Sequence, residues 1–191
     1  MQYQKDFKTA IFEFEALEEN HKEPYLYAFL GYALYSSQNF EKLLMNIIWG
    51  HKVVNRKGET AEEMNAFFDE YEFGKYTMGK LIRNVKAALI LSNAESKKLK
   101  EILRLRNFIV HTYFIANDRL LLAPNGYKVI IRDFLNFINI INELESDLHK
   151  YQLDFFEKVG LSKEKVQILI DTELKKFSAT HIEDFYQSII A

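Results

Sequence analysis

An apolar stretch, residues 104–114, contains two arginines, an asparagine and a histidine, which are Arg104, Arg106, Asn107 and His111. A leucine or phenylalanine would bury more easily there, because a guanidinium in a core must be paired or hydrated at a cost of several kcal/mol. The imidazole of His111 is suited to proton transfer near neutral pH, and an arginine is suited to binding an anion with its forked set of donors. These four residues are therefore the candidates for chemistry in this chain.

The candidates do not share one face of the helix that the stretch predicts. At about 100° per residue, a polar stripe within roughly 40° of His111 is formed by Lys97, Lys100, Arg104 and Asn107. Arg106 falls about 140° from His111, in the middle of the apolar arc, and Tyr113 lies near it on the wheel. Either the helix loosens before His111, or Arg106 and His111 meet other residues across a subunit interface.

The elements that position these residues are predicted to be helices. The chain has 191 residues, of which 48% are hydrophobic, with only 2 prolines and 7 glycines to interrupt them. So few chain breaks favour long helices over the many turns of a β protein, and the length suits one hydrophobic core. We expect an all-α protein with one domain covering residues 1–191.

Apolar spacing and helix-stop residues divide this domain into segments. Pro24 is expected in the first turn of the second helix, and Gly160 directly after the end of the last long one. The regions near 55–80 and 160–191 have no assigned role. The expected helices cover residues 6–20, 25–51, 81–91, 94–115 and 127–159, with shorter ones at 60–71, after Ser162 and at 180–190.

Composition excludes several classes of function. The chain has no cysteine, so disulfides, zinc knuckles, iron–sulfur clusters and thiol nucleophiles are excluded. The histidines have no partners at metal-ligand spacing, and neither a metal nor a cofactor is expected. The N-terminus lacks a secretory pattern and no apolar run approaches the roughly 18 to 20 residues of a membrane span, so a cytoplasmic protein is expected. A net charge of −2 means that any nucleic-acid contact must come from a local basic patch.

The sequence Arg106-Asn107-x3-His111 resembles the motif of HEPN domains, in which an arginine, often followed by asparagine, precedes a histidine after four to six residues. Tyr113 extends the match to Arg-x4-His-x-Tyr, the form seen in HepT-like toxins of the HEPN and nucleotidyltransferase toxin–antitoxin pairs. Arg104 also satisfies the spacing, so the motif arginine is either Arg104 or Arg106. The match is detailed only over residues 100–115. It implies an up-down helical bundle of HEPN type with additional short helices.

By this resemblance the chain is expected to be a metal-independent endoribonuclease of a bacterial toxin or defence system. His111 would take the proton from a ribose 2'-hydroxyl or give one to the leaving 5'-oxygen, with a 2',3'-cyclic phosphate as product. Arg106 would hold the scissile phosphate, and Asn107 would orient the imidazole or bind phosphate. The basic patch that binds RNA would consist of Lys97, Lys98, Lys100 and Arg104, with Arg119 as a further candidate.

The resemblance also predicts partners. One histidine cannot easily serve as both acid and base, and family members dimerise so that two motifs face one cleft. A homodimer is therefore expected, with Arg106 at its interface. A nucleotidyltransferase antitoxin is the other implied partner, and it would modify Tyr113 and so add bulk and negative charge to the cleft.

Other interpretations of the same residues stay open. In these, His111 is a hydrogen-bonded structural residue near a helix end, and Arg106 pairs with a buried carboxylate such as Glu41. Tyr113 is then a core residue with its hydroxyl at the rim, and the lysines form a solvated face. The alternative function is a non-catalytic HEPN-type helical module that binds a nucleotide, RNA or a protein partner. A third is an unrelated helical interaction domain.

Overall fold

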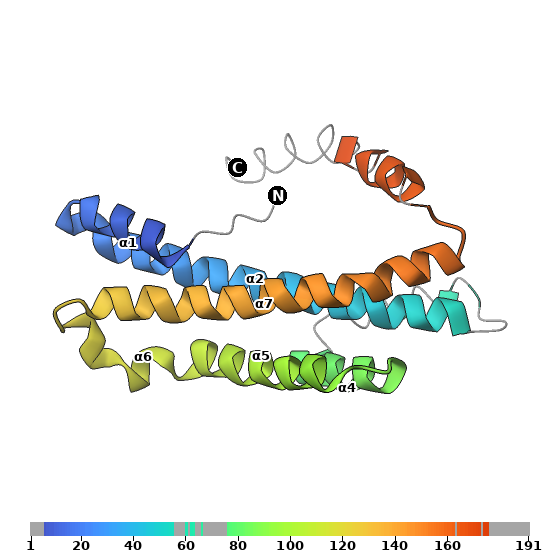
Figure 1. The fold of residues 1–191 in the computed structure, drawn as a ribbon, viewed down its shortest axis with the longest axis horizontal. Helices are drawn as coiled ribbons and strands as arrows, with labels where there is room; N and C mark the ends of the chain where they lie inside the picture. The colour runs from blue at the N-terminus through green and yellow to red at the C-terminus, as the bar shows by residue number, and fades with distance from the viewer. Residues whose placement is uncertain are drawn as a thin grey trace, which may run out of the picture.

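The computed structural model describes residues 6–55, 60, 62–63, 66, 76–162, 164–172 and 174–175. Regular structure in these residues is entirely helical, which confirms the all-α class. Thr60 and Glu63 exchange the two hydrogen bonds of a capping box, as expected, but most of 60–71 and all of 180–190 lie outside the described residues. The helices drawn in Figure 1 are α1 (Phe7–Ala16), α2 (Glu19–Asn55), α4 (Met78–Ala88), α5 (Asn93–His111), α6 (Tyr113–Ala116), the 3-10 helix η1 (Asp118–Leu121) and α7 (Gly126–Lys158).

The two longest helices, α2 and α7, lie side by side and run in the same direction (Figure 1). At their C-terminal ends the contact is very close, because a Cβ on Gly50 of α2 would lie only 2.8 Å from Cδ2 of Phe155 on α7. Helix α5 runs antiparallel to α7, since Lys98 pairs with Asp147 near one end and contacts between the same helices continue toward the other. Helix α4 completes the bundle by packing on α2 and α5.

The hydrophobic core lies between these four helices. Each of them presents fully or almost fully buried aliphatic and aromatic side chains, for which burial contributes about 1.5–3 kcal/mol per residue. The largest buried side chains are Phe40, Phe134, Phe137, Leu26, Leu44, Ile47, Leu81, Leu99, Ile102, Ile130, Ile131 and Ile138. The core therefore holds α5 by one face only and leaves its opposite face to solvent.

Helix α2 begins earlier than the sequence pattern predicts. It starts at Glu19, so Pro24 lies inside the helix and not in its first turn. The first four N–H groups of a helix have no acceptor within the helix. Pro24 follows soon after them, so its missing N–H removes only one backbone hydrogen bond near the N-terminal end of α2. The apolar face of α2 offsets this loss, and the helix continues without a break.

Helix α5 ends earlier than predicted, at His111 instead of Ile115. Thr112 leaves helical geometry with φ −135° and ψ −22°, and the chain then forms the short helix α6. The alternative that the helix loosens before His111 is therefore wrong, because the interruption follows His111. This leaves the histidine as the last helical residue of α5.

No helix among the described residues combines the length and the apolar character that crossing a membrane requires.

The last long helix ends close to the expected position. Helix α7 ends at Lys158, and Gly160 follows with φ +74°, a conformation that glycine adopts without strain. Ser162 then accepts a hydrogen bond from the Lys165 N–H, as expected of a helix cap.

Candidate functional site

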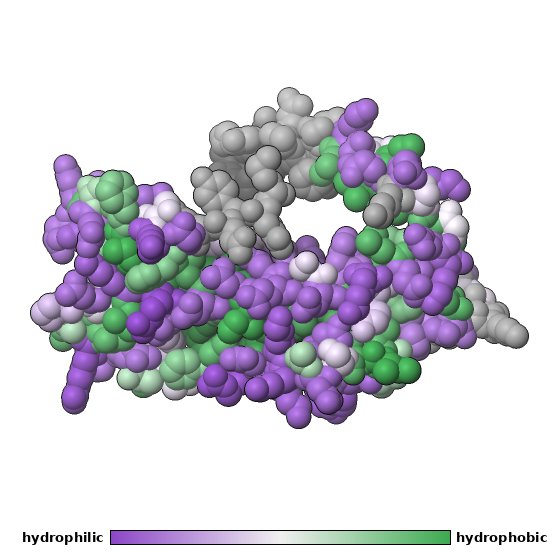
Figure 2. Space-filling view, viewed as in Figure 1, coloured by the Kyte–Doolittle hydropathy of each residue, from purple (hydrophilic) through white to green (hydrophobic). Residues whose placement is uncertain are grey.

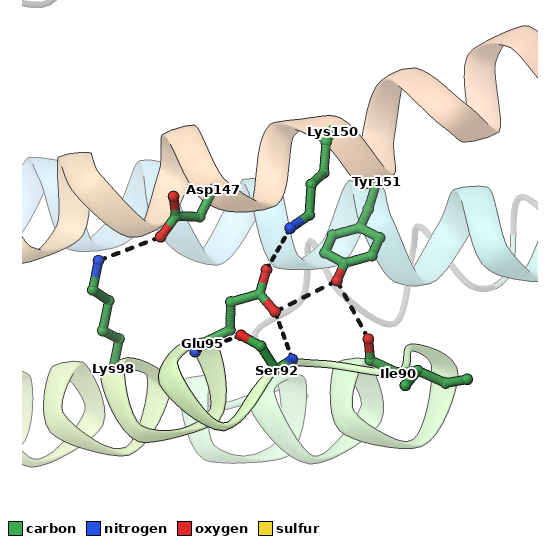
Figure 3. A network of polar contacts seen from close by, with 7 residues as sticks. All are labelled: Ile90, Ser92, Glu95, Lys98, Asp147, Lys150 and Tyr151. Atoms are coloured by element: carbon green, nitrogen blue, oxygen red, sulfur yellow. Dashed lines mark hydrogen bonds and ion pairs between the residues drawn. The ribbon is translucent and has the colours of Figure 1, made fainter.

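The start of α5 is fixed by a network of polar contacts around Glu95 (Figure 3). Ser92 is the N-cap: its hydroxyl accepts from the Glu95 N–H at 3.2 Å, and the Glu95 carboxylate accepts from the Ser92 N–H at 2.7 Å. Lys150 on α7 donates to Oε1 of the same carboxylate at 2.8 Å, although Glu95 is only 4% exposed. The carboxylate therefore ties the beginning of α5 to α7.

The electrostatics of Glu95 follow from these contacts. Burial by itself raises the pKa of the carboxyl group, but the hydrogen bonds from Lys150 and Ser92 outweigh it and hold the pKa below its usual value. One turn further along, Lys98 bridges to Glu143 and Asp147 of α7, each at 3.3 Å. Lys98 therefore fastens α5 to α7, and its predicted place in an RNA-binding patch is not supported.

The polar stripe predicted on α5 faces solvent along its whole length. This stripe consists of Lys97, Lys100, Arg104, Asn107 and His111, all of which are exposed. Their spacing of three or four residues places them on one side of a straight helix. The stripe is about 21 Å long at 1.5 Å per residue and ends at the break after His111.

The imidazole of His111 is free for an external partner. The residue is exposed, and within the described part of the chain its side chain makes no hydrogen bond or ion pair. The interpretation of His111 as a hydrogen-bonded structural residue is therefore not supported. An exposed imidazole at the end of a helix can reach a substrate or a second subunit.

Arg106 points away from His111, toward α2. Its Nη2 lies 3.9 Å from Oε1 of Glu41, an ion pair whose side chains are 31% and 18% exposed. Its Nη1 donates to Oδ1 of Asn107 at 3.3 Å, whereas its Nε is buried without a hydrogen-bond partner. The predicted alternative of an Arg106–Glu41 pair is thus confirmed. One chain alone does not bring Arg106 and His111 together, because they are about 140° apart on a continuous helix.

Glu41 is the carboxylate that compensates this arginine. Burial raises the pKa of Glu41, and the positive charge of Arg106 partly counteracts that rise. The 3.9 Å separation is long for an ion pair and no hydrogen bond accompanies it. Glu41 therefore orients the Arg106 side chain but neutralises its charge only weakly.

Tyr113 lies inside the bundle. It is 2% exposed, its hydroxyl donates to Oδ2 of Asp133 on α7 at 2.9 Å, and its ring packs on Phe134 with centroids 4.9 Å apart. Burial and the hydrogen bond to the carboxylate both raise the pKa of the phenol. The interpretation of Tyr113 as a core residue is confirmed. In this conformation the hydroxyl is not accessible to a modifying enzyme.

Other concave or ligating features lie elsewhere. A depression of about 540 Å³ is found where α1 meets the start of α7, lined among others by Glu15, Lys22 and Asn125, and it is not part of the stripe. The described residues contain no group of three or more histidines and carboxylates arranged to hold a metal ion. The candidate site is therefore the exposed stripe itself, which is separate from this depression.

The residues that orient this stripe are not among the candidates that the sequence predicts. Ser92 and Glu95 form the pattern Ser-x-x-Glu that is typical of a capping box. This pattern in the sequence is a signal by which the two residues could have been found. The interaction of Glu95 with Lys150 carries no sequence signal, because the two residues are 55 positions apart.

No protein-family model matches the chain, and neither a curated protein nor a solved structure is found to be similar to it.

Proposed function

We propose that this chain is a metal-independent endoribonuclease of HEPN type that acts as a homodimer. The observation that carries the proposal is the exposed His111 at the end of a stripe of cations and an asparagine. Among the described residues, the side chains of His111, Arg104 and Lys100 make no hydrogen bond or ion pair, so they are available to a ligand. Their types and common face fit an RNA phosphodiester.

The chemistry follows from the residue types. Cleavage begins with attack of a ribose 2'-oxygen on the adjacent phosphorus, while the bond from phosphorus to the 5'-oxygen breaks. A histidine takes the proton from the 2'-hydroxyl and a second gives one to the 5'-oxygen, each worth about 10² to 10⁴ in rate. The products are a 2',3'-cyclic phosphate and a 5'-hydroxyl. Two copies of the chain supply the two histidines.

Arg104 is the better placed of the two motif arginines. It is exposed and lies within about 20° of His111 on the helical wheel. Its guanidinium has no ion pair among the described residues, so it is available to stabilise the charge that develops on the phosphate. Arg106 is occupied by Glu41 and Asn107, and it positions Asn107 at the edge of the stripe.

The test is cleavage of a single-stranded RNA in EDTA by four variants. We expect His111→Ala and Arg104→Ala to lower the rate by at least about 10²-fold with unchanged unfolding midpoints. Lys8→Ala, which removes a cation from the exposed face of α1, is the matched control and should cleave like the parent. Arg106→Ala should lower stability as well as rate. Cleavage that survives in His111→Ala would rule out the proposal.

A second candidate is a non-catalytic HEPN-type module that binds RNA, a nucleotide or a protein. The separation of Arg106 from His111 favours it, because the Arg106 form of the motif is not assembled within one chain. It predicts RNA or nucleotide binding without cleavage. The toxin or defence setting and a nucleotidyltransferase antitoxin are supported by the motif alone, and the buried hydroxyl of Tyr113 weighs against that residue as the modified group.

A further inference from the structure

Helices α4 and α5 form a hairpin whose charge differs from that of the rest of the chain. Residues 78–111 contain eight lysines and arginines but only two glutamates, although the whole chain has a net charge of −2. In Figure 2 the middle of the lower edge, where α5 lies, is lined mainly by hydrophilic residues. The positive charge is therefore concentrated on this hairpin.

Some of these charges are already used within the bundle. Glu95 binds Lys150, Lys98 binds Glu143 and Asp147, and Arg106 faces Glu41. Lys80 lies 3.8 Å from the centre of the Tyr76 ring. What is left over is a set of cations without a carboxylate partner among the described residues. We call it the basic hairpin surface, and it consists of Arg83, Lys86, Lys97, Lys100 and Arg104.

The two helices bring these cations side by side. Leu103 of α5 packs on Gly79 of α4, and Lys86 of α4 reaches the Ser96 carbonyl of α5 at 3.4 Å. An antiparallel hairpin with these two contacts places Arg83, between Gly79 and Lys86, level with the middle of α5. Lys100 is in that part of α5, and the stripe continues from it to Arg104 and His111.

Lys86 of α4 and Lys100 of α5 repel one another across the hairpin. Burial of the Lys86 side chain lowers the pKa of its ammonium group, and the nearby charge of Lys100 lowers it further. Like charges placed together without carboxylates destabilise a protein unless an anion joins them. A chain of phosphates separates and neutralises such charges, whereas a single small anion would satisfy only one or two.

We propose that the basic hairpin surface is a track for the RNA backbone, in which Arg83 and Lys86 of α4 extend the stripe of α5 and lead the strand toward His111. This inference rests on the proposed function for its choice of RNA. It adds two residues from a different helix that no motif includes. They contact phosphates remote from the scissile one, so they contribute affinity and not proton transfer.

The test measures salt-dependent binding in a His111→Ala background, so that RNA is not consumed. Fluorescence anisotropy of a labelled single-stranded RNA of about 20 nucleotides is recorded with the parent and with Arg83→Gln/Lys86→Met. Each phosphate contact contributes about −0.7 to the slope of log affinity against log salt for a single strand. Loss of two contacts should reduce that slope by about 1.4. Between 50 and 200 mM salt the parent should then lose about 7-fold more affinity than the variant.

The controls separate this track from general charge and from the nuclease proposal. Lys8→Gln/Lys158→Met removes two cations that lie on α1 and at the end of α7, and it should keep the parent slope. Lys86→Arg keeps the positive charge and should retain most of the parent's binding. Circular dichroism should show the same unfolding midpoint for the parent and for all of these variants. The inference would be overturned if the hairpin variant kept the parent slope or if the control variant lost as much slope as the hairpin variant. It would also be overturned if the parent did not bind RNA, or if the parent preferred phosphatidylserine vesicles to RNA. Absence of cleavage by the unmutated protein with hairpin-dependent binding intact would remove the nuclease proposal alone.

Discussion

Replacing Glu95 by alanine should destabilise the protein more than any other single removal of a charge on α5. The substitution removes the reciprocal bond to the Ser92 N–H, worth about 1 kcal/mol. It also removes the charged hydrogen bond from Lys150, worth about 1.5–3 kcal/mol when buried. Because the Lys150 side chain is 61% exposed, only the lower end of that range applies. We expect a total loss of about 2–3 kcal/mol in the free energy of unfolding.

Urea unfolding followed by circular dichroism measures this loss, and thermal unfolding should show a shift of about 4–12 °C for a chain of this size. Glu95→Gln preserves the capping box and should lose only about 1 kcal/mol. Glu101→Ala, on the same helix and without a hydrogen bond or ion pair among the described residues, should change stability by no more than about 0.5 kcal/mol. If Glu95→Ala were as mild as Glu101→Ala, the network in Figure 3 would not hold α5 in place.

The same carboxylate gives a pH dependence with a definite sign. The pKa of Glu95 is lower in the folded protein than in the unfolded chain, so the unfolded state binds the proton more readily. Its contribution is therefore fully present above the unfolded pKa of about 4.3 and is lost as the pH falls through the folded pKa. The stability difference between the parent and Glu95→Gln should shrink below about pH 4. A difference that stayed constant down to pH 3 or grew there would contradict this cause.

Three other substitutions test the remaining contacts by urea unfolding. Gly126→Ala should lower stability by more than about 1 kcal/mol, because the added Cβ would lie 1.7 Å from the Leu120 carbonyl oxygen, and a neutral result would refute that close approach. Tyr113→Phe should lose about 1 kcal/mol through the bond to Asp133, and no loss would show that water replaces the hydroxyl fully. Arg106→Ala should lose about 1–2 kcal/mol at pH 7, and this loss should be smaller in a Glu41→Gln background, where no buried carboxylate is left unpaired.

Much of the scaffold could be predicted from the sequence because its signals are local. The apolar spacing of α5 and α7 and the glycine after α7 mark helices and their ends directly. The polar stripe of α5 also follows from spacing alone, and so does the separation of Arg106 from His111. Glu41, a carboxylate on the long second helix, could be named as a partner for Arg106, and the two side chains form an ion pair.

Other features of the structure could not be predicted from the sequence, mostly because they depend on contacts between residues that are distant in the chain. Nothing local shows that α2 begins before Pro24, since packing of its apolar face outweighs the proline. The break at Thr112 was also missed, because residues 108–115 have an apolar pattern that continues through it. Arg83 and Lys86 belong to no motif, and only the hairpin brings them beside the stripe.

The proposed function depends on proton transfer to or from RNA by the exposed imidazole of His111. The most direct measurement is mass spectrometry of the RNA ends produced in EDTA by the unmutated protein and by His111→Ala. We expect 2',3'-cyclic phosphate and 5'-hydroxyl ends to appear with the unmutated protein and to be absent with the variant. Intact RNA with the unmutated protein, or the same ends with His111→Ala, would contradict it.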